Sequence, residues 1–431
     1  MNLPDLVRAR ASWLTPQRLI VGGVLATGVG AFAALMSVGG KAGGLLSVWV
    51  LLLQSVVLFF YGVPAAVNDF VEEHRNNTWD MLRLTPLTGF EMVVGRLVAS
   101  TSYAAFLAAA LAPWALFAQS LGTTSPGYLG LGALWAALAT GFAASATLGM
   151  AAAALAARVQ GGVVGNTGMA IGGLGFLVTG YTMTMFSSAE TVNIFFGTVS
   201  AFTALSALLA FSAVWGAVGA VRTMGRLLSE RQTPWAIPAF MTSLWGLLAL
   251  WVPAGRGSEA LDALCITAPA LVAVLASFAE GEDREDWKAN HRLAVRRRDW
   301  GALLPRWSSA WLTVLLLAGL TYAFRPEASR IAAMVVCFLA RDLFLIGTLR
   351  TVLRRNVEVV AVAMLGGLYI LPVLGAASFD LVSSLHWMVP MEAANTGFLA
   401  NVVPGLVHAA AAGALFWARV GGLKAEAKLL R

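Results

Sequence analysis

The sequence predicts an all-α polytopic membrane protein with about 12 transmembrane helices, and its composition and its apolar runs both support this class. Of the 431 residues, 58% are hydrophobic and only 12% are charged, and the mean hydropathy is +0.76. Soluble domains carry about 25% charged residues. Many apolar runs reach the ~20 residues that cross a hydrocarbon core of ~30 Å, and they lack the alternation of strands. Only helices or closed barrels cross a bilayer, so helices are expected.

Twelve apolar runs are expected to span the membrane. They are Leu19–Val38, Leu45–Val67, Leu97–Ala118, Leu129–Ala157, Val163–Met185, Ile194–Val221, Trp235–Val252, Ala263–Ala279, Ala310–Phe324, Ile331–Leu349, Val357–Ala377 and Asn401–Ala418. An even number of spans places both termini on one side of the membrane.

Basic residues then indicate which side this is. Of the 29 Lys and Arg residues, 24 lie in the segments on the side of the termini and four in the opposite loops. Cytoplasmic loops carry such an excess, so both termini are expected in the cytoplasm of a multi-pass protein of the inner (cytoplasmic) cell membrane. The net charge of +7 is thus explained by the topology of a protein embedded in the lipid bilayer, and no nucleic-acid partner is expected.

The span pattern divides the chain into two tandem halves of six spans, residues 1–225 and 226–431. Each half places its largest predicted cytoplasmic loop between its second and third spans, at 68–96 and at 280–308. Three residues of the first loop recur in the second at a constant spacing of 208 positions: Phe70, Glu72 and Trp79 match Phe278, Glu280 and Trp287. Six spans per half give both halves the same orientation, as in a parallel duplication.

Small residues recur along the fourth and fifth predicted spans at near-helical spacing: Gly130, Ala133, Gly141, Ser145, Gly149, Gly165, Gly168, Gly172 and Gly175. Small side chains let membrane helices approach closely. The pattern predicts tight packing of these two spans, with a sliding surface as the alternative.

The first loop is expected to form a bent pair of helices. Pro86 ends the first helix, because the residue before a proline is pushed towards extended geometry. Thr88-Gly89-Phe90-Glu91 fits the capping box S/T-x-x-E, which predicts that Thr88 starts the third transmembrane helix. A rigid elbow of this kind, with its bend facing the cytoplasm, can transmit a push to two spans at once.

The same loop resembles the signature of ABC-2-type exporter permeases, the membrane subunits of ATP-driven exporters. Their acidic turn, their T-x-[DE]-x-L-x-x-[ST]-P-[LI] run and their G-[KR] pair are matched by Glu72-Glu73, Thr78–Leu87 and Gly95-Arg96. In that family this segment is the coupling helix, which docks into a groove on the ATPase. The residues that the resemblance assigns to coupling are Asp69, Glu72, Glu73, Arg75, Thr78, Trp79, Asp80, Leu82, Leu84, Thr85 and Pro86.

This resemblance implies the partner and the energy source. The expected partner is a cytoplasmic ABC ATPase subunit, acting as a dimer, which binds MgATP, and the chain itself is expected to bind no cofactor. The expected function is export across the membrane.

The second loop keeps an acidic cluster and the tryptophan but has no Thr-Pro-Leu run. Its candidate coupling residues are Glu280, Glu282, Glu285, Asp286 and Trp287. Arg296–Arg298 could instead contact anionic lipid headgroups. Both interpretations of this loop stay open.

Two ionisable residues, Arg341 and Asp342, lie within the tenth predicted span, where charges are costly and typically functional. Adjacent residues project about 100° apart on a helix, so we expect them to have different partners. A structural salt bridge, a local helix break and a substrate contact are the alternatives.

The sequence does not predict an enzyme. ATP hydrolysis requires a GxxxxGK[ST] loop, and the nearest lookalike, Gly39–Ala42, lacks the upstream Gly and the Ser/Thr. An intramembrane hydrolase is one alternative, because Glu72-Glu73 resembles the EExxxR motif of CAAX-type membrane proteases, although Asn77 replaces its Arg. A non-catalytic scaffold for envelope assembly is the other. The four histidines are scattered and His408 is alone in the last span, so no metal site is expected.

Overall fold

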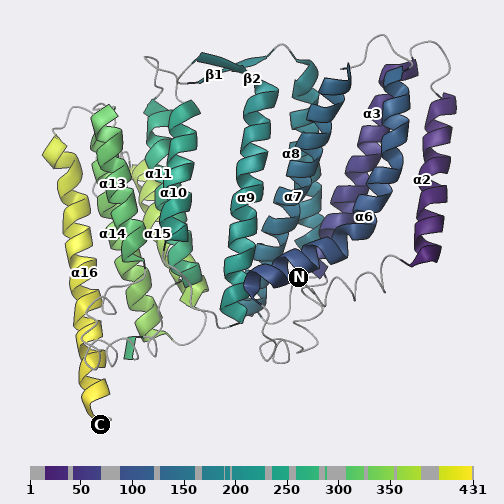
Figure 1. Ribbon diagram of the computed structural model, residues 1–431. Helices are drawn as coiled ribbons and strands as arrows, with labels where there is room; N and C mark the ends of the chain where they lie inside the picture. Colours follow the sequence, from purple (N-terminus) through teal and green to yellow (C-terminus); the bar gives the residue numbers. More distant parts are fainter. Residues whose placement is uncertain are drawn as a thin grey trace. The chain divides into compact units, whose positions relative to one another are not determined.

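The computed structural model of this protein describes residues 15–36, 42–68, 88–120, 127–160, 167–188, 190–194, 197–228, 235–251, 259–280, 287–288, 307–324, 329–353, 357–379 and 398–429. These residues are almost entirely helical (Figure 1). In chain order the elements are α2 (Pro16–Met36), α3 (Ala42–Val56), the π-helix η1 (Val57–Gly62), α6 (Gly89–Ser120), α7 (Gly127–Gln160), α8 (Thr167–Thr184), the 3₁₀-helix η2 (Met185–Ser187), β1 (Thr191–Ile194), β2 (Gly197–Ser200), α9 (Ala201–Leu227), α10 (Ala236–Trp251), α11 (Glu259–Glu280), α13 (Ser308–Phe324), α14 (Ser329–Val352), α15 (Val357–Phe379) and α16 (Phe398–Leu429).

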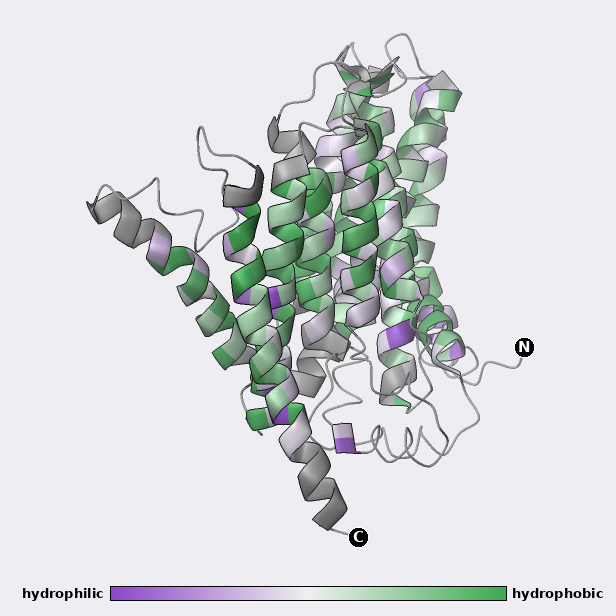
Figure 2. Cartoon of the chain, turned by 90° about the vertical axis from the view of Figure 1, so that its left-hand side faces the viewer, coloured by the Kyte–Doolittle hydropathy of each residue, from purple (hydrophilic) through white to green (hydrophobic). Residues whose placement is uncertain are grey.

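Each of the twelve predicted spans overlaps a helix of the described chain. Within the described residues, six helices are long and apolar enough to cross a bilayer: Leu46–Asn68, Gly89–Ser120, Tyr128–Ala153, Ala201–Gly225, Ile331–Val352 and Asn401–Gly422. Hydrophobic residues predominate along the helices in Figure 2. The chain is therefore an all-α multi-pass membrane protein, whereas twelve crossings and the placement of the termini stay predictions.

The predicted start of the sixth span at Ile194 is wrong. Residues 191–194 and 197–200 form the two strands of a small hairpin, and α9 begins only at Ala201. Gly197 has φ +146°, a conformation that L side chains rarely adopt, so α9 cannot extend back through this residue. Ser200 then caps α9, because its Oγ accepts a hydrogen bond of 3.2 Å from the Thr203 N–H.

Contacts within the chain separate two compact units. Unit 1 comprises residues 1–192 and 198–232, and unit 2 comprises residues 193–197 and 233–431. In unit 1 the most extensive packing joins α7 to α9, and α3 also packs on α6. In unit 2 it joins α14 to α16, and α10, α11 and α13 pack on one another. The division into two tandem halves of six spans each stays a prediction.

Small residues on α7 and α8 lie where helices of unit 1 approach most closely. A Cβ atom added at Gly149 would lie 2.7 Å from a Val67 methyl carbon, and one at Gly168 would lie 2.9 Å from the Pro64 Cα. One added at Gly172 would overlap the backbone carbonyl oxygen of Phe59, which belongs to the π-helix η1. The predicted tight packing is confirmed at these three glycines, because only glycine admits these approaches.

A buried amide adds polar bonds between helices of the same unit. Gln54 of α3 is 3% exposed, and its Nε2 donates a 2.8 Å hydrogen bond to the Ala108 carbonyl oxygen of α6. Its Oε1 accepts a 3.1 Å hydrogen bond from the indole of Trp135 on α7. The three helices α3, α6 and α7 are thus joined at one side chain.

We expect Gly172→Ala to lower the free energy of unfolding by about 1–3 kcal/mol, because the added methyl group meets backbone that cannot rotate away. Gly173→Ala is the matched control, since a Cβ there meets nothing within 4 Å. Thermal unfolding of both variants in detergent measures the difference. Equal midpoints for the two variants would contradict the close approach.

Candidate functional site

The residues that the resemblance assigns to ATPase coupling, from Asp69 to Pro86, lie outside the described residues. Glu282, Glu285 and Asp286 of the second loop also lie outside them, and Glu280 is the last residue of α11. The described residues include the helix that directly follows the first loop, the tryptophan of the second loop, and the charged pair of the tenth predicted span.

The predicted helix start at Thr88 is confirmed. The backbone N–H of Glu91 donates a 3.3 Å hydrogen bond to the Thr88 Oγ1, and the backbone N–H of Thr88 donates a 3.1 Å hydrogen bond to the Glu91 carboxylate. The Thr88 hydroxyl also donates to this carboxylate, at 3.0 Å. Two N–H groups at the helix start are satisfied reciprocally, which fixes where α6 begins.

The first turns of α6 are held against α9. A Cβ atom added at Gly89 would lie 2.7 Å from the backbone nitrogen of Gly225, so the two backbones nearly touch. Figure 1 shows these turns running across the end of α9 before α6 turns along α3. Arg96, the basic residue of the Gly95-Arg96 pair, is only 3% exposed and is therefore part of the packed interior of unit 1.

Trp287 of the second loop is a packing anchor within unit 2. It is 3% exposed, and its ring centroid lies 5.6 Å from that of Phe416 and 6.5 Å from that of Trp417, both on α16. An edge-to-face arrangement of this kind stabilises aromatic pairs beyond simple burial. Contact between this loop and an ATPase stays a prediction.

Arg341 and Asp342 are bonded to each other, so the prediction of separate partners is wrong. Arg341 Nε donates a 2.8 Å hydrogen bond to Asp342 Oδ1, and its Nη2 lies 2.8 Å from the same oxygen. Side chains of adjacent residues do not normally face each other on a helix. The long arginine side chain nevertheless folds back along α14, because two separated charges in an apolar interior would each stay uncompensated. The salt bridge, one of the alternatives, is confirmed.

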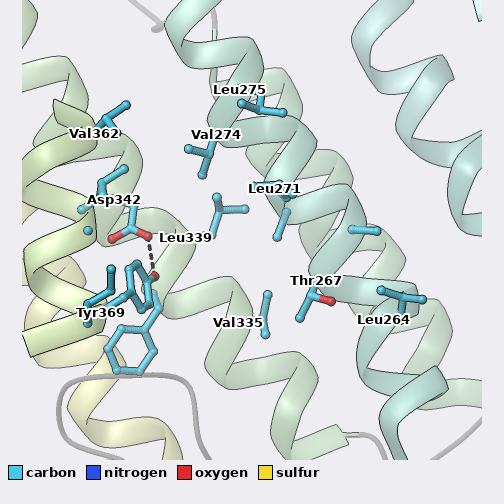
Figure 3. Close-up of a pocket in the computed structure, with 16 residues that line it drawn as sticks. Leu264, Thr267, Leu271, Val274, Leu275, Val335, Leu339, Asp342, Val362 and Tyr369 are labelled. Atoms are coloured by element: carbon cyan, nitrogen blue, oxygen red, sulfur yellow. Dashed lines mark hydrogen bonds between the residues drawn. The ribbon is translucent and has the colours of Figure 1, made fainter. Parts of the chain in front are cut away.

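Tyr369 of α15 completes this group of polar residues. Its hydroxyl donates a 2.5 Å hydrogen bond to Asp342 Oδ2 (Figure 3). The Arg341 guanidinium lies 5.1 Å from the Tyr369 ring centroid and 4.8 Å from that of Phe338, so both rings stabilise the cation through their π faces. This charge triad, defined as Arg341, Asp342 and Tyr369, links α14 to α15.

A cavity of about 720 Å³ lies beside the charge triad, between α11, α14 and α15. Its volume falls in the range of roughly 300–1,000 Å³ found for ligand sites. Apolar side chains form most of its lining, and Figure 3 shows those of α11 facing those of α14 and α15. Thr267, Asp342 and Tyr369 are the polar lining residues, whereas Arg341 does not line the cavity.

Sequence reasoning missed Tyr369 and Gln54. Each is a large hydrogen-bonding side chain in a mostly apolar run, LGGLYILPV and LLLQSVV respectively. That pattern is a usable signal, since a polar group in hydrocarbon needs a partner. It cannot name the partner, because the helices that bring Asp342 or Trp135 into reach are distant in the sequence.

The described residues contain no group of three or more His, Cys, Asp or Glu side chains that could hold a metal ion. His408 of α16 packs its ring edge-on against Phe338, with 5.9 Å between the ring centroids. Cys265 and Cys337 are both free thiols. Comparisons of this chain with protein-family models, with curated proteins and with solved structures find no match.

Removal of the Thr88 hydroxyl is expected to destabilise the start of α6. Thr88→Ala should lower the free energy of unfolding by about 0.5–2 kcal/mol, because the Glu91 N–H loses its acceptor. Thr88→Ser keeps the hydroxyl and should stay near the parent protein. Chemical denaturation in mixed micelles measures both values, and an effect of equal size in the two variants would argue against the capping box.

Tyr369→Phe should lower the free energy of unfolding by about 1–2 kcal/mol, because a hydrogen bond to a buried carboxylate is lost in a low-dielectric setting. Tyr322→Phe on α13 is the matched control, since that side chain is 59% exposed. Thermal melts of purified protein in detergent compare the two. Equal melting temperatures would show that the hydroxyl contributes nothing to the packing of α15.

Proposed function

We propose that this chain is the transmembrane permease subunit of an ATP-driven ABC exporter. A separate cytoplasmic ATPase, acting as a dimer, binds and hydrolyses MgATP, and the chain couples that cycle to movement of a substrate. The proposal rests on the coupling signature in residues 68–96, on the multi-pass helical fold, and on the way the structure attaches the end of that signature to the membrane helices.

The way the start of α6 is fixed and packed is the observation that carries this proposal. A push on the loop before Thr88 reaches a helix whose first residue is fixed by a capping box. That helix abuts α9 at Gly89 and continues along α3, so a movement of its first turns acts on several helices of unit 1. A solvent-exposed connector without a mechanical role would not require a backbone contact as close as that between Gly89 and Gly225.

In this proposal the chain crosses the inner membrane twelve times as two tandem six-span halves, with both termini in the cytoplasm. Closure of the ATPase dimer presses on the first loop through Glu72, Glu73 and the Thr85-Pro86 break. The second loop provides a further docking surface or a contact with lipid headgroups. Movement of the membrane helices then opens a path for the substrate.

An ATPase should co-purify with the chain in a manner that depends on the first loop. The tagged full-length protein is purified from its own cells in mild detergent, and MgATP hydrolysis and Walker-type peptides are measured. Thr85→Ala with Pro86→Ala should lower the recovered ATPase activity about tenfold, equivalent to ~1.4 kcal/mol of binding. The matched control is Ser125→Ala with Pro126→Ala, which changes a Ser-Pro pair in a predicted outside loop.

Loss of activity in both double variants, or in neither, would contradict coupling through the first loop. A chain that co-purifies with no ATPase but hydrolyses a peptide or lipid ester would support the intramembrane hydrolase instead. A chain that does neither would be left as a scaffold.

A further inference from the structure

The cavity beside the charge triad is open to its surroundings and lies within the membrane, features that ATPase coupling does not require. It is open on one side, because several of its lining residues are exposed, among them Leu271 at 60%, Val362 at 61% and Ile370 at 58%. Asp342 is the fourteenth of the 24 residues of α14, near the middle of a helix ~36 Å long. A molecule in this cavity therefore lies at the depth of the hydrocarbon chains.

The charge balance of the lining restricts what can bind. Asp342 lines the cavity, but the charge of its carboxylate is already compensated by Arg341, which does not line it. A cation would meet no net negative charge and would lose its hydration, and an anion would face a carboxylate. The site therefore disfavours both kinds of ion.

Among the described residues, the Asp342 carboxylate keeps capacity to accept a further hydrogen bond. A carboxylate offers about four lone-pair positions. Oδ1 of Asp342 faces two nitrogens of Arg341, whereas Oδ2 accepts one hydrogen bond, from Tyr369, among the described residues. The second lone pair of Oδ2 can accept from a hydroxyl or amide of a bound molecule. Such a bond to an ionised acceptor is stronger than one between neutral groups.

We propose that this cavity is a binding site for an uncharged amphipathic lipid, a long hydrocarbon that carries a hydroxyl or amide donor. The hydrocarbon contacts Leu264, Leu271 and Leu275 of α11 and Val362 of α15, and the donor binds Asp342 Oδ2. The charge triad holds the carboxylate in place and neutralises it, so that the site selects a donor without a charge. This assignment does not depend on an ATPase partner.

Photolabelling of the full-length protein in phosphatidylcholine nanodiscs, without any ATPase, tests the site. The probe is a C16 alcohol with a diazirine near the middle of its chain, and peptide mass spectrometry locates the labels. We expect labels concentrated on the lining residues of α11, α14 and α15. Leu271→Trp, which fills the cavity, should lower this labelling about fivefold or more, equivalent to ~1 kcal/mol of binding.

Two sets of controls make the result specific. Leu316→Trp on α13 changes an equally apolar residue that is 69% exposed and does not line the cavity, so it should leave the labelling unchanged. The corresponding C16 methyl ether, amine and carboxylate probes should each label the cavity about threefold less than the alcohol or weaker, because they lack the donor or carry a charge.

Labelling spread evenly over the lipid-facing helices, or unaffected by Leu271→Trp, would overturn the binding site. Stronger labelling by the amine than by the alcohol would overturn the choice of an uncharged ligand. Because no ATPase is present, either result is independent of whether the coupling proposal holds.

Discussion

In the interior of a membrane, no water replaces a hydrogen bond that the protein fails to make, and this constraint governs the described structure. Backbone groups are satisfied by the helices themselves. Many hydroxyl groups donate to a carbonyl oxygen one turn earlier, as Ser55 does to Leu51 and Ser145 does to Gly141, each at 2.8 Å. Two of the larger polar side chains bind across helices: Gln54 bonds to α6 and α7, and Asp342 bonds to Tyr369 of α15. Gln54 and Asp342 therefore each link helices whose pairing cannot be read from the sequence alone.

The same constraint removes the hydrophobic effect as a force between helices, so close contact of atoms has to replace it. Unit 1 achieves this contact through glycines at the crossings of α7 and α8 with η1 and the helical turn that follows it. A π-helix is often found at functional positions, and η1 lies in the span that leads into the first loop. Helices pack closely at both ends of this loop: Gly172 contacts η1, which precedes the loop in the sequence, and Gly89, near the end of the loop, contacts α9. The surrounding helices are therefore suited to transmit a displacement.

The two units use their polar residues differently. In unit 1 the polar contacts fix helix positions: Gln54 joins α3, α6 and α7, and Thr88 with Glu91 fixes the start of α6. In unit 2 the charge triad lies beside a cavity, so its carboxylate is both a link between α14 and α15 and a surface that a ligand can touch. Force transmission and ligand binding are thus proposed for different parts of the chain. Each proposal has a test that does not rely on the other.

The sequence by itself determined the helical membrane class, the positions of the helices along the chain, and the start of α6. These features depend on local patterns: apolar runs of spanning length, and a capping box whose atoms lie three residues apart. It also indicated which small residues pack closely. Only the tertiary structure decided that Arg341 and Asp342 bind each other, that Tyr369 joins them, and that a cavity lies beside them. Those contacts depend on which distant helices become neighbours, and lipid-soluble helices carry no strong sequence signal for their choice of partner. The hairpin before α9 shows the same limit, because apolar residues such as Val192 and Ile194 suit a strand as well as a helix until Gly197 and Ser200 set the boundary.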